Sequence, residues 1–267
     1  MKIYVINLPA SERRRQNMKR RLDSFDLRYE IIQAVSTSEI SPDMIDGINN
    51  LAPRGGTIKQ GEVACARSHS KALSKMFDDG EEVGVILEDD VIFDRRFSRL
   101  VKSLSPEILK NGPLLLGGTF FVPTRLIKME HISDGNYHYA AEQLENVWGA
   151  MAYAIKKEDA ERLSAQMLKT HCRSDDWLFY VNEGVIENVT ICFPFVIQHE
   201  ELNSDVAKFA GFSGLHSISA ISKLIHKYRI FPFFQISIGL RQRRAERRQS
   251  RNIISKDGPY SKTYQLK

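Results

Sequence analysis

The sequence predicts an α/β fold in which a mixed, mostly parallel sheet is covered by helices on both faces. Apolar runs of strand length alternate along the chain with stretches of helical periodicity. The run Val83–Leu87 lacks polar alternation, which is typical of a strand buried on both faces. The 267 residues suffice for one large domain, and 42% hydrophobic with 27% charged residues excludes a disordered chain.

The N-terminal part is expected to hold two strands on either side of a basic helix. The apolar run Lys2–Leu8 predicts the first strand, and Ser11 can cap a helix that continues to about Phe25. A second strand is predicted at Tyr29–Val35. The stretch 36–57 is rich in Ser, Pro, Asn and Gly, which favours an irregular loop with at most a short helix.

The same alternation continues towards the middle of the chain. Apolar side chains recur every three or four residues over Gly61–Phe77, which predicts a helix with Cys65 and His69 on one face. Val83–Leu87 then forms a central strand. The other expected elements are a helix over Phe97–Leu109, strands at Pro113–Gly118 and Trp148–Ile155, and a helix from Lys157 to about Leu168.

The net charge of +5 is unevenly distributed and predicts two parts. Residues 222–267 hold 12 lysines and arginines against two acids, a net charge of +10, whereas residues 1–221 hold 26 bases and 31 acids, a net charge of −5. A nucleic-acid-binding body would carry a basic surface of its own, so nucleic acid is not an expected partner.

The three cysteines, Cys65, Cys172 and Cys192, are an odd number without close spacing. A disulfide scaffold and a cysteine-rich zinc site are therefore not expected, and a reducing cytoplasm is the simplest compartment. The N-terminal apolar run is too short for a signal peptide, and no apolar run approaches the roughly 20 residues that span a bilayer.

Glu88-Asp89-Asp90, directly after the predicted central strand, is the sharpest chemical feature. Ligands of open α/β sheets bind beyond the carboxyl ends of the strands. Three adjacent carboxylates repel one another, and Mg²⁺ or Mn²⁺ with oxygen ligands would relieve that repulsion. The alternative is a solvated acidic turn that caps the next helix. For Ser68 and His69 in the preceding helix, the alternative to a functional role is a hydrogen-bonded place in the core.

Several blocks occur in one order and at compatible spacing. They are Ile6-Asn7-Leu8 with Arg13-Arg14, Gly61-Glu62 with Cys65 and Ser68-His69, Leu87-Glu88-Asp89-Asp90-Val91, and Trp148-Gly149-Ala150 with Tyr153. Together they resemble glycosyltransferase family 25, the lipooligosaccharide galactosyltransferases of Gram-negative bacteria, over roughly residues 1–205. The resemblance implies a GT-A fold, a UDP-galactose donor and transfer with inversion to a β-linked product. Ala64 departs from the family, which usually has a second glycine there.

By this resemblance, Asp90 and Glu88 would bind Mn²⁺ or Mg²⁺, which neutralises the departing UDP. His199 is a third candidate ligand, with a plain surface histidine as its alternative. The expected donor-binding residues are Asn7, Leu8, Arg13, Arg14, Ser68, His69, Glu88, Asp89, Gly117 and Gly118. A solvated helix face is the alternative for the arginines, and simple turn chemistry is the alternative for the glycines.

An inverting transfer also needs a base for the acceptor hydroxyl, and Ser174-Asp175-Asp176-Trp177 is the candidate segment. Asp176 is preferred slightly over Asp175. The alternative is a helix N-cap, and one acid can cap while the other acts as base. The expected acceptor-binding residues are Trp148, Gly149 and Trp177, whose indole could stack on a sugar.

The tail interleaves aromatic and basic residues around Pro232 and ends in the cationic cluster Arg241–Arg251. This composition suits an anionic lipid surface, and the membrane-anchored acceptor of the resembled family favours it. A helix packed on the body, a solvated tail and a nucleic-acid patch are the alternatives.

The expected function is metal-dependent transfer of galactose from UDP-galactose to lipooligosaccharide core, by a cytoplasmic enzyme that is peripheral on the inner membrane. Residues 1–221 would be the GT-A domain, and 222–267 the basic helical appendage that meets the membrane. Transfer of another sugar, such as glucose, keeps the same fold. A non-catalytic nucleotide-sugar-binding or scaffold protein is the alternative of a different class.

Overall fold

The computed structural model describes most of residues 1–199 and a few residues beyond them. The gaps lie at 52–55, 118, 121–123, 134–135, 142 and 170–171, and beyond 199 the structure describes 236, 240, 243, 247, 253–255 and 258–259. Most of the predicted tail, including Pro232, therefore lies outside the described residues.

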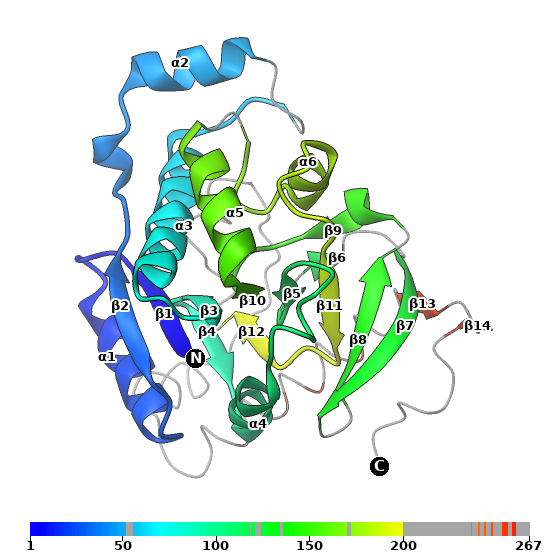
Figure 1. Cartoon of the computed structure of the whole chain (residues 1–267). Helices are drawn as coiled ribbons and strands as arrows, with labels where there is room; N and C mark the ends of the chain where they lie inside the picture. The colour runs from blue at the N-terminus through cyan, green and yellow to red at the C-terminus, as the bar shows by residue number, and fades with distance from the viewer. Residues whose placement is uncertain are drawn as a thin grey trace.

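Within the described residues, ten strands form one mixed sheet (Figure 1). In sheet order they are β14 (Gly258–Pro259), β13 (Ile253–Ser255), β7 (Thr124–Ser133), β8 (Asn136–Ala141), β11 (Thr190–Phe193), β5 (Leu114–Leu115), β10 (Ala152–Lys156), β3 (Val83–Glu88), β1 (Lys2–Asn7) and β2 (Tyr29–Gln33). The pairings make β10, β8 and β14 run opposite to the other seven strands. The prediction of a mixed sheet with mostly one strand direction is confirmed.

Two small sheets flank the large one, β12 (Ile197–His199) with β4 (Val91–Phe93), and β6 (Thr119–Phe120) with β9 (Val147–Trp148). The described helices are α1 (Glu12–Asp23), α2 (Pro42–Asn50), α3 (Gln60–Asp78), α4 (Arg95–Ser103), α5 (Lys157–Lys169) and α6 (Trp177–Asn182), with 3₁₀ turns at Thr37–Glu39 and Leu144–Asn146. No described helix has the length and apolar character needed to cross a bilayer.

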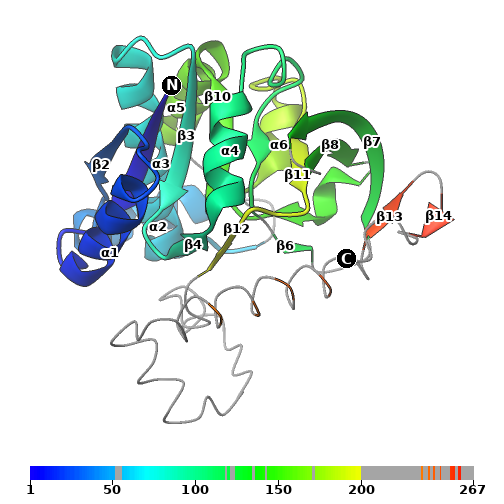
Figure 2. The same cartoon turned by 90° about the horizontal axis from the view of Figure 1, so that it is seen from below.

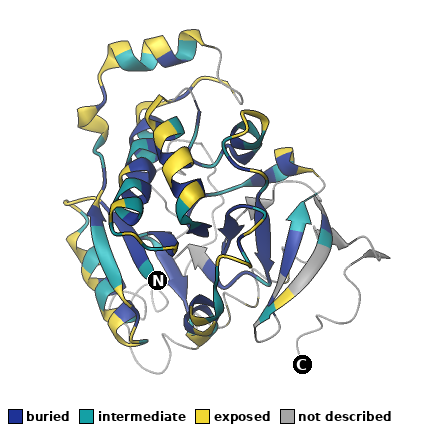
Figure 3. Ribbon diagram, in the orientation of Figure 1, coloured by how far each residue is buried: buried dark blue, intermediate teal, exposed yellow. Residues whose placement is uncertain are grey.

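Alternate side chains of β1 enter two different cores. Tyr4 lies in the core that contains Leu73 of α3 and Leu163 of α5. Val5 points the other way, into the core that contains Leu22 of α1 and residues of α4. Because side chains alternate between the faces of a strand, this division places helices on both faces, as predicted. Figure 2 shows α4 in front of the sheet and α3 behind it, and Figure 3 shows the buried strands between helices with exposed outer surfaces.

The predicted strands and helices of the N-terminal half correspond to β1, α1, β2, α3 and β3. The stretch 36–57 contains α2, the short helix allowed there. The helix predicted over Phe97–Leu109 is α4, which starts earlier, at Arg95, and ends earlier, at Ser103. It starts earlier because Asp94 Oδ1 accepts a hydrogen bond from the amide of Arg96 over 2.8 Å and caps it. The strand predicted at Trp148–Ile155 is interrupted at Gly149, where φ is +100°.

The C-terminal segment contributes to the sheet. The backbone of β13 pairs in parallel with β7, and β14 pairs with β13. Residues 253–255 and 258–259 therefore extend the edge of the large sheet, although the charge-based division placed them in an appendage. Ile236, Leu240, Arg243 and Arg247 are helical and exposed.

Candidate active site

The acidic triplet lies where two parallel strands end. In the register of β1 and β3, Ile6 is opposite Glu88, so the carboxyl ends of both strands reach the same edge of the sheet. The N-terminal half of α3 and the segment that leads into α6 close on this edge from one side, since Cys65 Sγ lies 3.4 Å from Ser174 Oγ. The prediction that the triplet follows the carboxyl end of a central strand is confirmed, and ligands of open α/β sheets bind at such an edge.

Asp89 points into the protein rather than towards a ligand. Its carboxylate accepts a 2.6 Å hydrogen bond from Asn7 Nδ2 and lies 3.5 Å from Arg14 Nη1. Burial raises the pKa of Asp89 to about 6, although Asn7 and Arg14 act in the opposite direction. Asn7 and Asp89 are both buried and bridge the ends of β1 and β3, so the donor contacts predicted for these two side chains are replaced by a structural one.

The other residues predicted near the first strand lie closer to the surface. Leu8 is exposed, Arg13 on α1 is exposed and Arg14 is half-buried. These three side chains border the same edge as the triplet, because they follow the end of β1. They remain candidates for contacts with an anionic ligand.

His69 connects the helix to the triplet. Its Nε2 lies 3.4 Å from Glu88 Oε1, and its Nδ1 lies 3.1 Å from the hydroxyl of Tyr153 on β10. The imidazole is fully buried and stacks on the Tyr153 ring with 5.8 Å between centroids, whereas Glu88 is 28% exposed. His69 therefore orients Glu88 from inside the protein, and Glu88 presents its carboxylate to the edge.

Ser68, the neighbour of His69, has a structural role. Its hydroxyl donates to the carbonyl of Ala64 over 2.7 Å and accepts from the amide of Val35 over 2.8 Å. The side chain is 3% exposed and its single proton is in use. In this structure the hydroxyl links the segment after β2 to α3, and the donor contact expected for Ser68 stays a prediction.

Asp175 lies opposite the triplet. Its Oδ2 accepts a 3.0 Å hydrogen bond from the amide of Gly149. Burial raises the pKa of Asp175 and the nearby carboxylate of Glu88 raises it further, while the hydrogen bond from Gly149 lowers it. A carboxylate with this environment is suited to accept a proton.

Asp176, the preferred base in the sequence prediction, caps α6 instead. Its Oδ1 accepts from the amide of Phe179 over 3.3 Å, and the residue is 1% exposed. The two roles foreseen for the acidic pair are thus divided between its members, with Asp176 at the helix N-terminus and Asp175 towards Glu88. The preference for Asp176 is reversed by this geometry.

Of the predicted acceptor residues, only Trp148 keeps a partly exposed ring. Its Nε1 donates to the carbonyl of Glu145 over 3.1 Å. Trp177 is fully buried: its Nε1 donates to the carbonyl of Gly149 over 3.2 Å, and its ring meets Tyr153 edge to face at 5.4 Å. In this structure the indole supports the Gly149 turn from the core, and the expected stacking of Trp177 on a sugar stays a prediction.

Gly117 serves close packing. A Cβ at this position would lie 3.0 Å from the carbonyl oxygen of Ile197 and 3.2 Å from Met151 Sδ. Gly118 lies outside the described residues. The backbone of His199 pairs with Val91, the residue after Asp90, so β12 brings His199 to the triplet, although its side chain is outside the described part.

Two groups of side chains here can hold a cation. Glu88 and Asp90 are both partly exposed at the strand end and offer the hard oxygen ligands that Mg²⁺ or Mn²⁺ requires. Cys65, His69 and Glu88 each place one ligand atom within 4.8 Å of the others. Burial raises the pKa of the Cys65 thiol. The negative charges of Glu88, Asp175 and Asp90 raise it further, so all three carboxylates lie near enough to this thiol to affect it.

Sequence reasoning placed Cys65 on one helix face with His69 and gave neither Cys65 nor Tyr153 a specific role. The spacing of Cys65 and His69, four residues apart on one helix face, is the signal that could have joined them. The contact between Tyr153 and His69 joins β10 to α3 across 84 residues, and no local pattern reveals it.

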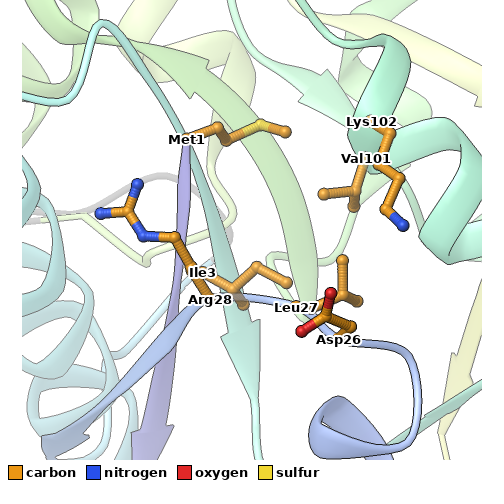
Figure 4. Close-up of a pocket in the computed structure, with 7 residues that line it drawn as sticks. All are labelled: Met1, Ile3, Asp26, Leu27, Arg28, Val101 and Lys102. Carbon is orange, nitrogen blue, oxygen red and sulfur yellow. The ribbon is translucent and has the colours of Figure 1, made fainter.

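A separate pocket of about 170 Å³ lies at the opposite end of β1 (Figure 4). It is lined by Met1, Ile3, Asp26, Leu27, Arg28, Val101 and Lys102. None of the predicted site residues lines it, and its lining holds no group of acids like that at the other end of the strand.

The chain is similar to known glycosyltransferases. The family model described as glycosyltransferase family 25 (LPS biosynthesis protein) matches residues 1–178. Procollagen galactosyltransferase 1 of Danio rerio is 24% identical over 203 residues, which cover 72% of this chain and 33% of that protein. Procollagen galactosyltransferase 2 of Homo sapiens is 26% identical over 113 residues, 40% of this chain and 18% of that protein.

A glycosyltransferase 25 family member of Aedes aegypti is 29% identical over 117 residues, which cover 41% of this chain and 19% of that protein. This chain thus spans a third or less of the length of these relatives. A crystal structure of mannose-1-phosphate geranyltransferase from Thermus thermophilus matches with a TM-score of 0.32 and 11% identity over 71% of this chain and 72% of that chain. Because the family model matches more than half of its residues, the chain belongs to glycosyltransferase family 25.

Proposed function

We propose that this chain transfers galactose from UDP-galactose to a sugar hydroxyl of lipooligosaccharide core, with inversion and in a metal-dependent reaction on a GT-A type fold. The position of Asp175 carries the proposal: its carboxylate lies close enough to Glu88 for the two charges to interact, across the edge where β1 and β3 end. One acid is then available to the acceptor and a group of acids to the donor. The names of the relatives support galactose as the sugar, and the description of the family model supports the acceptor class.

The donor would lie at the strand ends, with its diphosphate towards the triplet. Glu88 and Asp90 would hold Mn²⁺ or Mg²⁺, with His199 as a third ligand. When bound, this ion supplies positive charge that stabilises the departing UDP. His69 fixes the carboxylate of Glu88, since its Nε2 lies 3.4 Å from Oε1. Arg13 and Arg14, just beyond the end of β1, would contact donor phosphate or ribose.

Asp175 would take the proton of the acceptor hydroxyl. The oxygen then attacks the anomeric carbon as the bond from that carbon to UDP breaks on the opposite face, which inverts the configuration. The raised pKa of Asp175 makes its carboxylate more basic, and the amide of Gly149 holds Oδ2 in place over 3.0 Å. The partly exposed ring of Trp148, next to Gly149, is positioned to border the acceptor sugar.

The proposed acceptor and the charge of the tail favour a location at the cytoplasmic face of the inner membrane. Lipooligosaccharide precursors are held there by their lipid, and a cationic, partly helical tail is attracted to anionic headgroups. Arg243 and Arg247 are exposed and follow Ile236 and Leu240 at helical spacing, which supports a surface that is apolar at one end and basic at the other.

UDP release in the presence of different UDP-sugars tests the proposal directly. The purified chain is incubated with lipooligosaccharide acceptor and UDP-galactose, UDP-glucose or UDP-N-acetylglucosamine, each with and without Mn²⁺. The expected result is release that requires acceptor and Mn²⁺ and is fastest with UDP-galactose. Faster release of UDP from UDP-glucose would identify UDP-glucose, not UDP-galactose, as the donor. Binding of UDP-sugars without any turnover would indicate a non-catalytic protein.

A further inference from the structure

Cys65, His69 and Glu88 form a compact set of donor atoms of mixed chemistry. We propose that they bind one divalent ion of the zinc class through thiolate, imidazole and carboxylate, at a site that shares Glu88 with the oxygen-rich Glu88 and Asp90 pair but does not use Asp90. The proposal depends on the geometry of these three side chains and not on the proposed transfer reaction.

The spacing of the three donor atoms fits a single small ion. Zinc–ligand bonds of about 2.0–2.3 Å place the ligand atoms of a tetrahedral site about 3.5 Å apart. His69 Nε2 and Glu88 Oε1 already lie 3.4 Å apart, and the three donor atoms lie within 4.8 Å of one another.

The elements that carry these residues hold them in place. Cys65 and His69 lie one turn apart on α3, so both face β3, whose last residue is Glu88. Tyr153 supports the histidine from behind, because its hydroxyl lies 3.1 Å from Nδ1 and leaves Nε2 towards Glu88. A partner on the second ring nitrogen is the usual support of a histidine that binds a metal.

The surroundings favour a cation and its class. The carboxylates of Glu88 and Asp90 both lie partly exposed at the end of β3, and a bound cation would relieve the repulsion between them. Thiolate and imidazole favour Zn²⁺ or Co²⁺ over Mg²⁺ and Mn²⁺. Three protein ligands leave the fourth position of a tetrahedral ion open to water or to a ligand atom of a substrate.

Cobalt titration of the metal-free full-length chain tests the site, because a thiolate bound to Co²⁺ gives a charge-transfer absorption in the near ultraviolet. The expected result is a band that saturates at one Co²⁺ per chain, is removed by Zn²⁺ and is absent in Cys65→Ser. Cys172→Ser is the matched control: Cys172 donates to Tyr180 Oη at 3.3 Å, away from the three donors, and this variant should keep the band. Asp90→Asn should also keep it, which separates this site from the oxygen-rich one.

Two further measurements support the assignment. Tyr153→Phe should weaken Co²⁺ affinity by about tenfold, as loss of an outer hydrogen bond does at other histidine–metal sites. In the wild-type chain, Zn²⁺ should slow alkylation of Cys65, measured by mass spectrometry, while Mg²⁺ should not. This experiment needs no variant and so does not depend on the folding of Cys65→Ser. No band in the wild-type chain, a band that persists in Cys65→Ser, or equal alkylation with and without Zn²⁺ would each overturn the site. If the wild-type chain shows the Co²⁺ band but does not turn over UDP-galactose, the metal site stands and the proposed function is contradicted.

Discussion

The amide nitrogen of Gly149 lies 3.0 Å from Asp175 Oδ2 and donates a hydrogen bond to it, while the carbonyl of the same glycine accepts from Trp177 Nε1 over 3.2 Å. One peptide turn is thus held on both sides by the segment that enters α6. The turn needs φ of +100° at Gly149, a region that a residue with a Cβ rarely adopts. The position of the proposed base therefore depends on a backbone conformation.

Gly149→Ala is expected to lower the free energy of unfolding by about 1–2 kcal/mol, because alanine is strained at this φ. It should also lower kcat more than it raises KM for the donor, since Asp175 loses its fixed position. Urea denaturation and steady-state kinetics measure the two effects. Gly80→Ala is the matched control: Gly80 has φ of +70° at the far end of α3, so it should lose similar stability with unchanged kinetics. Equal kinetic losses in both variants would contradict the role of the Gly149 turn.

Substitution of the acidic pair separates the base from the cap. Asp175→Asn should lower kcat by about 10²–10⁴-fold, as expected when a general base is lost, with little change in stability. Asp176→Asn should keep near-normal turnover, because asparagine also caps helices, whereas Asp176→Ala should lose about 0.5–2 kcal/mol of stability. Since the pKa of Asp175 is raised, the decline of kcat at acid pH should begin above the ordinary range of an aspartate and be missing from the residual activity of Asp175→Asn. Normal turnover of Asp175→Asn would refute its role as base.

Asp89 gives stability a dependence on pH. Its folded-state pKa of about 6 lies above the ordinary value of 3.8, so the folded chain binds the proton more tightly than the unfolded chain. The favourable contribution of protonated Asp89 to the free energy of unfolding is complete below the pKa of Asp89 in the unfolded chain. It is lost as the pH rises through the pKa of Asp89 in the folded chain. The loss amounts to about 2 kcal/mol between pH 4 and pH 7.

Asp89→Asn removes this dependence and can still accept the hydrogen bond from Asn7. The variant should be more stable than the wild-type chain at neutral pH and of similar stability near pH 4, in urea denaturation at a series of pH values. Other buried acids titrate in both chains, so the difference between the two curves isolates Asp89. A difference that does not change with pH would contradict the raised pKa.

Chelation should remove activity if Asp90 and Glu88 hold the metal ion that neutralises the negative charge of the departing UDP. EDTA is expected to reduce galactose transfer to background and added Mn²⁺ to restore it, whereas Asp90→Ala should stay inactive at Mn²⁺ levels that saturate the wild-type chain. Asp94→Ala removes a nearby aspartate whose carboxylate caps α4, so it serves as the control and should keep Mn²⁺-dependent transfer. Turnover of Asp90→Ala equal to that of the wild-type chain would place the ion elsewhere.

The sequence predicted elements and neighbourhoods better than it predicted the direction of side chains. Alternation and apolar runs located β1, α3 and β3, and the rule for strand ends located the triplet. Whether a polar side chain faces a ligand or the interior depends on contacts between distant segments. Asp89 points inward because Asn7 lies across a strand pair, 82 residues away. Trp177, at the start of α6, is buried because its ring packs on Tyr153 of β10. Nothing in the local sequence Ser174–Trp177 distinguishes a buried indole from one that stacks on a sugar.

The cationic helix of the tail gives the last prediction. Arg243 and Arg247 are exposed and lie one turn apart, so both can meet the same surface. Each basic residue near an anionic membrane contributes about 1 kcal/mol, so Arg243→Gln with Arg247→Gln should weaken binding to phosphatidylserine vesicles by about 30-fold.

The matched control is Arg28→Gln with Lys110→Gln, which removes the same charge from exposed positions on the body. Vesicle co-sedimentation of the full chain measures both, with phosphatidylcholine vesicles as the uncharged reference. If the two double variants lose binding equally, net charge alone attracts the chain and the tail has no special part. If only the tail variant loses binding, while release of UDP with a soluble acceptor is unchanged, membrane contact and catalysis belong to different segments of the chain.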